Sequence, residues 1–447
     1  MTDIATKFAG PVFTPDDPGY AEEVAGFQTA YTHRPEFVVG ALHSQDVRAA
    51  VEFAARHGLP VAVQATGHGL SVAVDGGVLI TTGRMDTITI DRLARTAHIG
   101  AGVRAGALVE AAARHGLAPL NGSSPSVGVV GYVLGGGLGL LAREFGYAAD
   151  HVRRIELVTA DGRVRSLGPD DELFGAVLGS GGNFGVVTGL ELDLVPVAEI
   201  YGGQLVFDAP LVDAALAAWR EWTATVPSEL TSTIAVVTYP DIPPVPESLR
   251  GRHVASIRIA FDGTDEEGER WVAPLRRIGP RLHEDLRTMP YAETHTIHSD
   301  PPFPHAYAAT NALLAELTPQ GLSALRALTA PGGQVDAVID SRHLGAALRH
   351  GGPASIDFRN AEYIVRVITG PGAGDAAPEG LAAVREALAP WTIGHSLAFL
   401  YGAGGAADAA QTAAGYSPDT YRWLTAAKAK YDPRNMFRAN RNIAPGS

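Results

Sequence analysis

The chain has 447 residues, of which 46% are hydrophobic and 19% charged, so it is long enough for two or three domains with a large core. Its formal net charge of −13 provides no basic surface for nucleic acid, and no apolar stretch approaches the roughly 20 residues that span a bilayer. The segment Met1 to Gly10 has no apolar run typical of a secretory signal, so we expect a cytoplasmic protein without a membrane partner.

The N-terminal part of the chain alternates helical and strand-like patterns. Residues 44–58 and 104–116 carry apolar side chains at helical spacing, and the second pattern ends at Gly116. The apolar runs 59–63 and 77–80 predict two strands on either side of a turn of small residues. This alternation is typical of an α+β domain.

The turn between these two strands, Gln64-Ala65-Thr66-Gly67-His68-Gly69, carries a single histidine at its tip. Small residues allow backbone N–H groups to approach a phosphate closely, and His68 projects from the loop alone. Two further glycine-rich segments follow at 122–139 and 179–189. The three loops together indicate that the chain wraps a large cofactor that carries phosphate.

The second glycine segment also permits an alternative interpretation. Residues 137–142 fit the relaxed G-x-G-x-x-(G/A) fingerprint of nicotinamide dinucleotide sites, and Glu156 lies near the distance expected for a ribose contact. A Rossmann unit requires a strand that leads into these glycines, and Gly128 and Gly131 interrupt that strand. The dinucleotide interpretation therefore depends on whether a βαβ unit forms here.

After Pro196 the pattern changes to a series of strands. Strand-like runs occur at 203–208, 231–239 and 253–261, helical patterns at 266–278 and 318–329, and further strand candidates at 334–341, 361–369 and 395–401. Segments 370–378 and 402–415, rich in Ala, Gly and Pro, predict loops. This order predicts a mostly antiparallel sheet with helices on one face.

Residues 36–196 resemble the flavin-binding domain of the vanillyl-alcohol-oxidase and p-cresol-methylhydroxylase superfamily. The ending Tyr431-Asp432-Pro433-Arg434-Asn435-Met436-Phe437-Arg438-Ala439-Asn440-Arg441-Asn442-Ile443 resembles the C-terminal signature of its berberine-bridge-enzyme-like branch. The resemblance implies an α+β protein with a two-part FAD-binding domain of the p-cresol-methylhydroxylase type. It also implies a substrate domain with a mostly antiparallel sheet backed by helices. We expect the FAD-binding domain at 1–196, the substrate-binding domain at 197–415, and a C-terminal segment, 416–447, that returns to the FAD domain.

In that family, the histidine of an Arg-Ser-Gly-Gly-His loop is bonded covalently to the flavin 8α-methyl carbon. His68 occupies this place, although Gln64, Ala65 and Thr66 depart from the usual residues. Some members attach the flavin a second time through a cysteine. Ser124 stands at that position and the chain has no cysteine, so the resemblance implies FAD held through His68 only. The FAD contacts that it implies are Gln64, Ala65, Thr66, Gly67, His68, Gly69, Ser124, Pro125, Val127, Gly128, Gly131, Tyr132, Gly135, Gly185, Val186, Val187, Asn440 and Asn442.

The resemblance also implies an FAD-dependent oxidase that takes a hydride from a small organic or natural-product substrate to flavin N5, with O2 as electron acceptor. The alternatives are a flavin-dependent oxygenase in natural-product tailoring and a flavin-retaining cyclase without net redox change. No pattern in the sequence indicates an oligomeric state.

The catalytic candidates are polar side chains expected to face the flavin. Asp336 shares one strand face with Val338 and Asp340 by period-two alternation, and this face points either to the cofactor or to solvent. Tyr363 and Tyr401 are the aromatic candidates, while Ala398 replaces an asparagine of many relatives. We interpret Arg342 and His343 as the structural end of this strand. We interpret His295, His298 and His305 as loop residues rather than a metal site.

Overall fold

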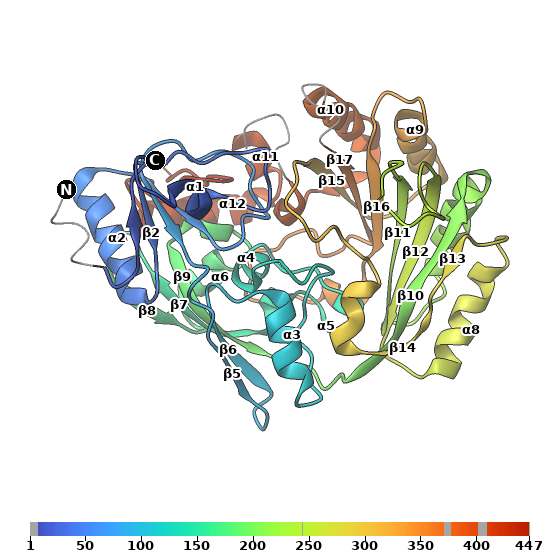
Figure 1. Ribbon diagram of the computed structural model, residues 1–447, viewed down its shortest axis with the longest axis horizontal. Helices are drawn as coiled ribbons and strands as arrows, with labels where there is room; N and C mark the ends of the chain where they lie inside the picture. The colour runs from blue at the N-terminus through green and yellow to red at the C-terminus, as the bar shows by residue number, and fades with distance from the viewer. Residues whose placement is uncertain (1–7, 244, 371–376, 401–408, 447) are drawn as a thin grey trace.

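The computed structural model describes residues 8–243, 245–370, 377–400 and 409–446. Figure 1 shows two halves side by side, with the N-terminal elements in one and a large sheet in the other. Within the described residues no helix is long and apolar enough to cross a membrane.

The N-terminal half contains two sheets. The first has the order β1 (Val12–Phe13), β2 (Phe37–Gly40), β4 (Val78–Thr81) and β3 (Val61–Gln64), and its β2–β4 and β4–β3 pairs are parallel. The second is antiparallel, with the order β5 (Ile88–Asp91), β6 (Thr96–Gly100), β9 (Val186–Asp193), β7 (Val152–Val158) and β8 (Val164–Leu167). The helices of this half are α1 (Tyr20–Val24), α2 (Ser44–His57), α3 (Ala105–Ala113), α4 (Val129–Leu134), α5 (Ala142–Phe145) and α6 (Glu172–Val177).

The helix α2 illustrates how local sequence sets these elements. Val47, Ala50, Val51 and Ala54 recur at helical spacing and are fully buried in the N-terminal core. The helix ends where Gly58 adopts a φ of 69°, a left-handed conformation that glycine accepts without strain.

The βαβ unit of the dinucleotide interpretation is not formed. The helix α4, not a strand, precedes Gly137, and Glu156 lies on β7, where its carboxylate is 3.4 Å from His98 Nε2. The alternative therefore fails, because the glycines follow a helix end instead of joining a strand to a helix.

The second half is built on a nine-stranded antiparallel sheet. Its order is β13 (His283–Glu284), β10 (Glu199–Asp208), β12 (His253–Phe261), β11 (Leu230–Thr238), β16 (Val338–His343), β17 (Tyr363–Thr369), β15 (Ala308–Leu314) and β18 (Thr392–Gly394), and β14 (Arg287–Pro290) also pairs with β10. The helices α7 (Val212–Thr223), α8 (Asp265–Arg276), α9 (Pro319–Thr329) and α10 (Ala377–Leu388) bury apolar side chains against one face of this sheet. In Figure 1, α8 lies on the side of the sheet away from the N-terminal half. The predicted fold class is confirmed by this arrangement.

Two of the expected strands differ from the structure. The strand expected at 334–341 begins only at Val338, after a turn that contains Pro331, Gly332 and Gly333. The run expected at 395–401 contains a 3-10 turn at Leu397–Phe399, in which the Phe399 amide donates to the Ser396 carbonyl. Residue 401 and the first half of the loop expected at 402–415 lie outside the described residues, as do 371–376 of the loop expected at 370–378. The second half of 402–415 differs from the expectation, because it contains a short helix at Ala409–Ala413.

The C-terminal segment packs into the N-terminal half. After α11 (Ala409–Ala413), α12 (Pro418–Tyr431) lies beside α6, and Leu424, Met436 and Phe437 belong to the N-terminal core. The Val61 amide of β3 donates to the Met436 carbonyl at 3.0 Å. This contact places the chain end next to the loop that carries His68.

Candidate cofactor and substrate site

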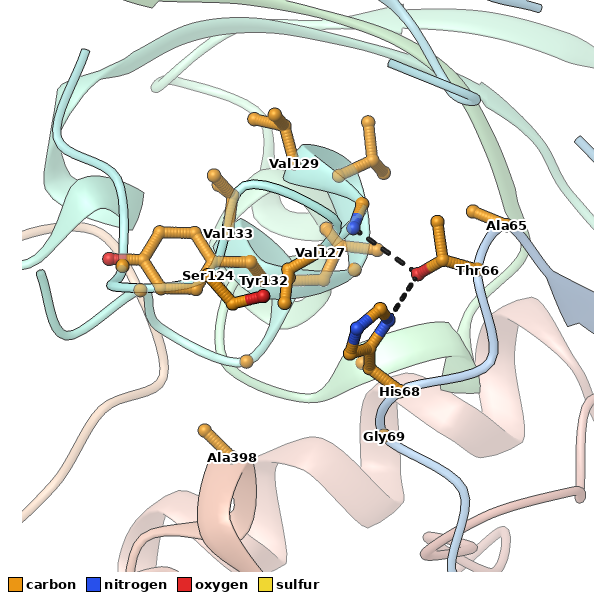
Figure 2. A pocket seen from close by; sticks show the side chains of 18 of the residues that line it. Ala65, Thr66, His68, Gly69, Ser124, Val127, Val129, Tyr132, Val133 and Ala398 are labelled. Atoms are coloured by element: carbon orange, nitrogen blue, oxygen red, sulfur yellow. Dashed lines mark hydrogen bonds between the residues drawn. The ribbon is translucent and has the colours of Figure 1, made fainter. Parts of the chain in front are cut away.

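A cavity of about 670 Å³ runs between the two halves. Its lining comes from all three glycine segments, from the C-terminal segment near Phe437, and from the face of the nine-stranded sheet opposite α7–α10. Figure 2 shows the loop of His68 facing α4 across this space, with Ala398 on a third side. The cavity therefore brings together parts of the chain that are distant in sequence.

Both imidazole nitrogens of His68 have hydroxyl partners. Nδ1 lies 2.9 Å from Thr66 Oγ1, and Nε2 lies 3.1 Å from Ser126 Oγ. Thr66 Oγ1 also accepts a hydrogen bond of 3.3 Å from the Gly128 amide, as Figure 2 shows. Thr66 thus orients the imidazole and joins its loop to the residue that precedes α4.

Packing and electrostatics keep His68 neutral. Its ring stacks on Phe27, with 3.8 Å between the centroids and 13° between the planes. Burial lowers the pKa of His68 to about 4, and the nearby Arg104 and His305 add to this effect. At pH 7 one ring nitrogen consequently carries a lone pair.

The lining fits FAD in two respects. A Cβ at Gly131, Gly181 or Gly182 would meet no protein atom within 4 Å, so these backbones are open to a ligand. Within the described part of the chain, the amide N–H groups of Gly67, His68 and Gly69 donate to no protein acceptor, and these residues line the cavity. Open backbone and unused amide donors are the features that bind phosphate and ring carbonyl groups.

Gly67 shows why the loop needs small residues. Its φ is 72°, and a Cβ at this position would lie 2.6 Å from Gly26 Cα. A larger residue would push the loop away from its neighbour and displace His68.

Most of the expected FAD contacts line the cavity, but Pro125, Val186 and Asn442 do not. Pro125 is exposed, Val186 is buried within β9, and Asn442 is half-buried outside the lining. Those that line it are Gln64, Ala65, Thr66, Gly67, His68, Gly69, Ser124, Val127, Gly128, Gly131, Tyr132, Gly135, Gly185, Val187 and Asn440.

Asn440 uses its side chain to hold the loop of His68. Its Oδ1 accepts from the Ser71 amide at 3.0 Å, and its Nδ2 donates to the Gly69 carbonyl at 3.1 Å. The amide therefore ties the C-terminal segment to this loop rather than pointing at a cofactor edge.

The catalytic candidates from the sequence do not meet at the cavity. Asp336 is exposed, precedes β16 and is not part of the lining, so its predicted place over the flavin is wrong. Tyr363 is also misplaced: it faces α7, where its hydroxyl lies 2.6 Å from Thr223 Oγ1. Tyr401 lies outside the described residues. The alternation itself was predicted correctly, because Val338 and Asp340 do line the cavity.

The sheet face presents three charged residues, of which the sequence pattern had pointed only to Asp340 as a residue that could face the cofactor; Arg342 and Arg366 had not been singled out as functional. Asp340 accepts from Arg342 Nε at 3.4 Å and from Arg366 Nη1 at 3.3 Å. Burial opposes ionisation of Asp340, but Arg366 and Arg342 outweigh it and hold its pKa well below the ordinary value. Arg342 is therefore a lining residue of the cavity and not only the end of a strand.

His298 and Asp300 also line the cavity, from the segment that follows β14. Asp300 accepts a hydrogen bond of 2.5 Å from Ser123 Oγ, next to Ser124. Burial opposes ionisation of Asp300, but His298, the Ser123 hydroxyl and Arg258 keep its pKa below the ordinary value. Burial also lowers the pKa of His298 to about 3, assisted by Arg258, so its imidazole is neutral at pH 7.

The sequence around His298 and Asp300 has no periodic pattern or motif that would indicate a site, and His298 was expected to be a loop residue. Their place at the cavity depends on tertiary contacts of this segment, among them the hydrogen bond from Ser123 to Asp300. The described residues contain no group of three or more His, Cys, Asp or Glu side chains placed to hold a metal ion.

Comparisons with known proteins also indicate that the N-terminal half binds FAD. An FAD binding domain family matches residues 35–168. The (R)-6-hydroxynicotine oxidase of Paenarthrobacter nicotinovorans is 30% identical over 453 residues, which cover 98% of this chain and 97% of that protein.

Two solved structures share the fold over nearly the whole chain. The 6-hydroxy-D-nicotine oxidase of Arthrobacter nicotinovorans superposes with a TM-score of 0.81 at 26% identity, and the match covers 98% of both chains. The BBE-like 1 protein of Physcomitrella patens superposes with a TM-score of 0.86 at 18% identity, over 100% of this chain and 99% of that one.

Proposed function

The chain belongs to the berberine-bridge-enzyme-like family of FAD-linked oxidoreductases, and on this basis we propose that it is an oxidase with FAD attached once, through His68. We take its substrate to be a small organic molecule that loses a hydride from a C–H bond, with O2 as the electron acceptor. The observation that carries the proposal is the neutral imidazole of His68 inside a cavity lined by open glycine backbone.

When bound, FAD supplies the two-electron acceptor for the substrate and returns the electrons to O2. The chain positions the imidazole of His68 and keeps it in its neutral form. Attachment would join an imidazole nitrogen to the 8α-methyl carbon of FAD, with loss of one proton from each partner and passage of two electrons to O2, which would become peroxide. The lowered pKa of His68 provides the nitrogen lone pair that this bond requires at neutral pH. Thr66 and Ser126 hold the ring on either side, which fixes the direction of each nitrogen.

Single attachment rests on Ser124. Its Oγ lies 3.0 Å from Ser126 Oγ, which in turn contacts His68 Nε2 at 3.1 Å. A hydroxyl is a far weaker nucleophile than a thiolate at neutral pH, and the chain contains no cysteine. His68 is therefore the attachment residue, and Ser124 leaves that side of the cofactor to non-covalent contacts.

Proton transfer from the substrate requires an acceptor in the cavity. We assign this role to Asp300, because its pKa keeps it ionised and its hydrogen-bond partner is a neutral hydroxyl, that of Ser123. Asp340 is less suited because two guanidinium groups already bind its carboxylate. Both oxygens of Asp340 accept from a guanidinium, whereas only Oδ2 of Asp300 accepts a hydrogen bond from the described residues, so Asp300 keeps an oxygen for a proton.

Anaerobic mixing of the purified protein with a panel of small alcohols and amines, including (R)-6-hydroxynicotine, tests the proposal. An oxidase bleaches the flavin absorbance with its substrate and forms hydrogen peroxide when air is admitted. Incorporation of labelled oxygen into the product would instead identify an oxygenase. Conversion of a substrate without flavin reduction would identify a cyclase.

A further inference from the structure

Two rows of side chains cross the cavity face of the nine-stranded sheet. Arg258 of β12 pairs with Thr233 of β11, which pairs with Arg342 of β16. Directly paired residues of antiparallel strands lie on the same face, so the two arginines stand two strands apart, about 10 Å between backbones. In the next row, Asp340 pairs with Arg366 of β17. Arg258, Arg342, Arg366 and Asp340, with the neighbouring Asp300, are called the arginine cluster below.

In the second row, an acidic side chain pairs with the arginines. Asp340 binds both Arg342 and Arg366, and it is only 6% exposed. Both guanidinium groups also lie over the ring of Phe399, at 5.3 Å and 4.2 Å from its centroid. These contacts fix the positions of Arg342 and Arg366 before any ligand arrives.

In the first row, the charge of Arg258 is not balanced by an acidic partner in the described part of the chain. The guanidinium of Arg258 forms no hydrogen bond or ion pair with the described residues, and its Nε is buried without a partner. The hydroxyl of Tyr132 is a second buried group that lacks a hydrogen-bond partner there, and burial raises its pKa so that it stays a donor. Both residues line the cavity. Buried donors without acceptors are costly, so their presence indicates a ligand that accepts.

The charge of the arginine cluster specifies that ligand. Three guanidinium groups face two carboxylates, and His298 beside them is neutral, which leaves an excess of one positive charge. The surrounding lining includes the apolar side chains of Val237, Val338, Ile368 and Phe399. A single negative charge on an apolar body matches this environment, whereas a phosphate dianion would exceed it.

We propose that the arginine cluster binds the carboxylate of a monoanionic organic substrate, with Arg258 as its main partner and Arg342 as its second. The inference rests on the proposed function, since it names the substrate class of the same site. A guanidinium donates two parallel hydrogen bonds to a carboxylate, and the buried Nε of Arg258 has the donor that such a pair requires.

Calorimetric titration of the oxidised flavoprotein with benzoate and with benzamide tests this proposal. The two probes have nearly the same shape and differ in charge, so the proposal predicts that benzoate binds at least tenfold more tightly. Arg258→Met should weaken benzoate binding at least tenfold, about 1.4 kcal/mol, and change benzamide binding less than twofold. Arg258→Lys should retain part of the preference because it keeps the charge but not the planar donor pair.

Arg252→Met is the matched control. Arg252 precedes the same strand, is half-exposed, and binds Asp208 at 2.7 Å away from the cavity. This variant should bind benzoate as the wild type does. Circular dichroism and flavin content establish that each variant is folded.

Equal affinities of the wild type for benzoate and benzamide would overturn the proposal without any variant. The proposal would also be overturned if Arg258→Met left the benzoate affinity unchanged and altered the flavin reduction potential. Arg258 would then stabilise the negative charge of the reduced flavin and would not bind the substrate. The proposed oxidase function fails separately, if no substrate reduces the flavin, because calorimetry detects anion binding without turnover.

Discussion

Lys428 and Asp432 form a fully buried ion pair that fastens the C-terminal segment to the cofactor half. Lys428 Nζ lies 2.9 Å from Asp432 Oδ2, and both side chains are at most 1% exposed. The same ammonium donates to the Asn183 carbonyl at 2.6 Å and to the Phe437 carbonyl at 2.7 Å. Burial lowers the pKa of Lys428, while Asp432 opposes this shift.

Replacing Lys428 with Met removes the cation and keeps most of the side-chain volume. Asp432 would retain the amides of Met436 and Phe437 but lose its only ion-pair partner among the described residues. Removal of one partner from a buried pair costs about 3–5 kcal/mol. At about 2 °C per kcal/mol, the expected fall in melting temperature is roughly 6–10 °C.

Thermal unfolding of the holoprotein, followed by circular dichroism, measures this effect. Lys430→Met is the matched control, because Lys430 lies on the same helix and its ion pair with Glu172 is exposed. We expect the control to melt with the wild type and Lys428→Met to incorporate less flavin, since Phe437 lines the cavity. Coincident melting of all three proteins would refute the structural role given to this pair.

Three further changes address the site. Asp300→Asn should slow flavin reduction by substrate about 10²-fold at unchanged FAD content. Asp336→Asn is the control, because Asp336 is exposed outside the cavity, and it should leave this rate unchanged. Equal rates of flavin reduction in the two variants would remove Asp300 from the mechanism. His68→Ala should release its flavin in acid. The double variant with Ser124→Cys should retain the flavin, because a thiol at position 124 would stand where some relatives attach the ring. Free flavin from the acid-treated double variant would contradict this placement of Ser124. Burial holds the pKa of His298 at about 3 against 6.5 unfolded, so the unfolded chain gains a proton first as pH falls. The stability advantage of wild type over His298→Gln should therefore shrink by about 2 kcal/mol between pH 7 and pH 5 in urea unfolding, and a constant difference would contradict it.

The glycine loops and the positions of several strands along the chain could be predicted because they depend on local patterns. The loop of His68 lies between two short apolar runs, and β10, β11 and β12 follow separate apolar segments in sequence. Alternation also placed Val338 and Asp340 on one face correctly.

Other features depend on tertiary contacts that a local pattern does not contain. Tyr363 shares one face of β17 with the apolar Val365 and Val367, and the charged Arg366 lies on the other face, which meets the cavity. Choosing Tyr363 as a catalytic candidate overlooked this alternation. The run at 397–400 has no clear period and forms a turn because Leu397 and Leu400 bury into the N-terminal core. The place of Arg258 follows only from its register with Thr233 and Arg342.

In the proposed enzyme, FAD is bonded to His68 and to no other residue. Proteolysis of the acid-denatured protein followed by mass spectrometry tests it most directly. We expect one flavin-bearing peptide, which contains His68, and an unmodified peptide that contains Ser124. Flavin recovered entirely in the acid supernatant, or found on any other peptide, would contradict it.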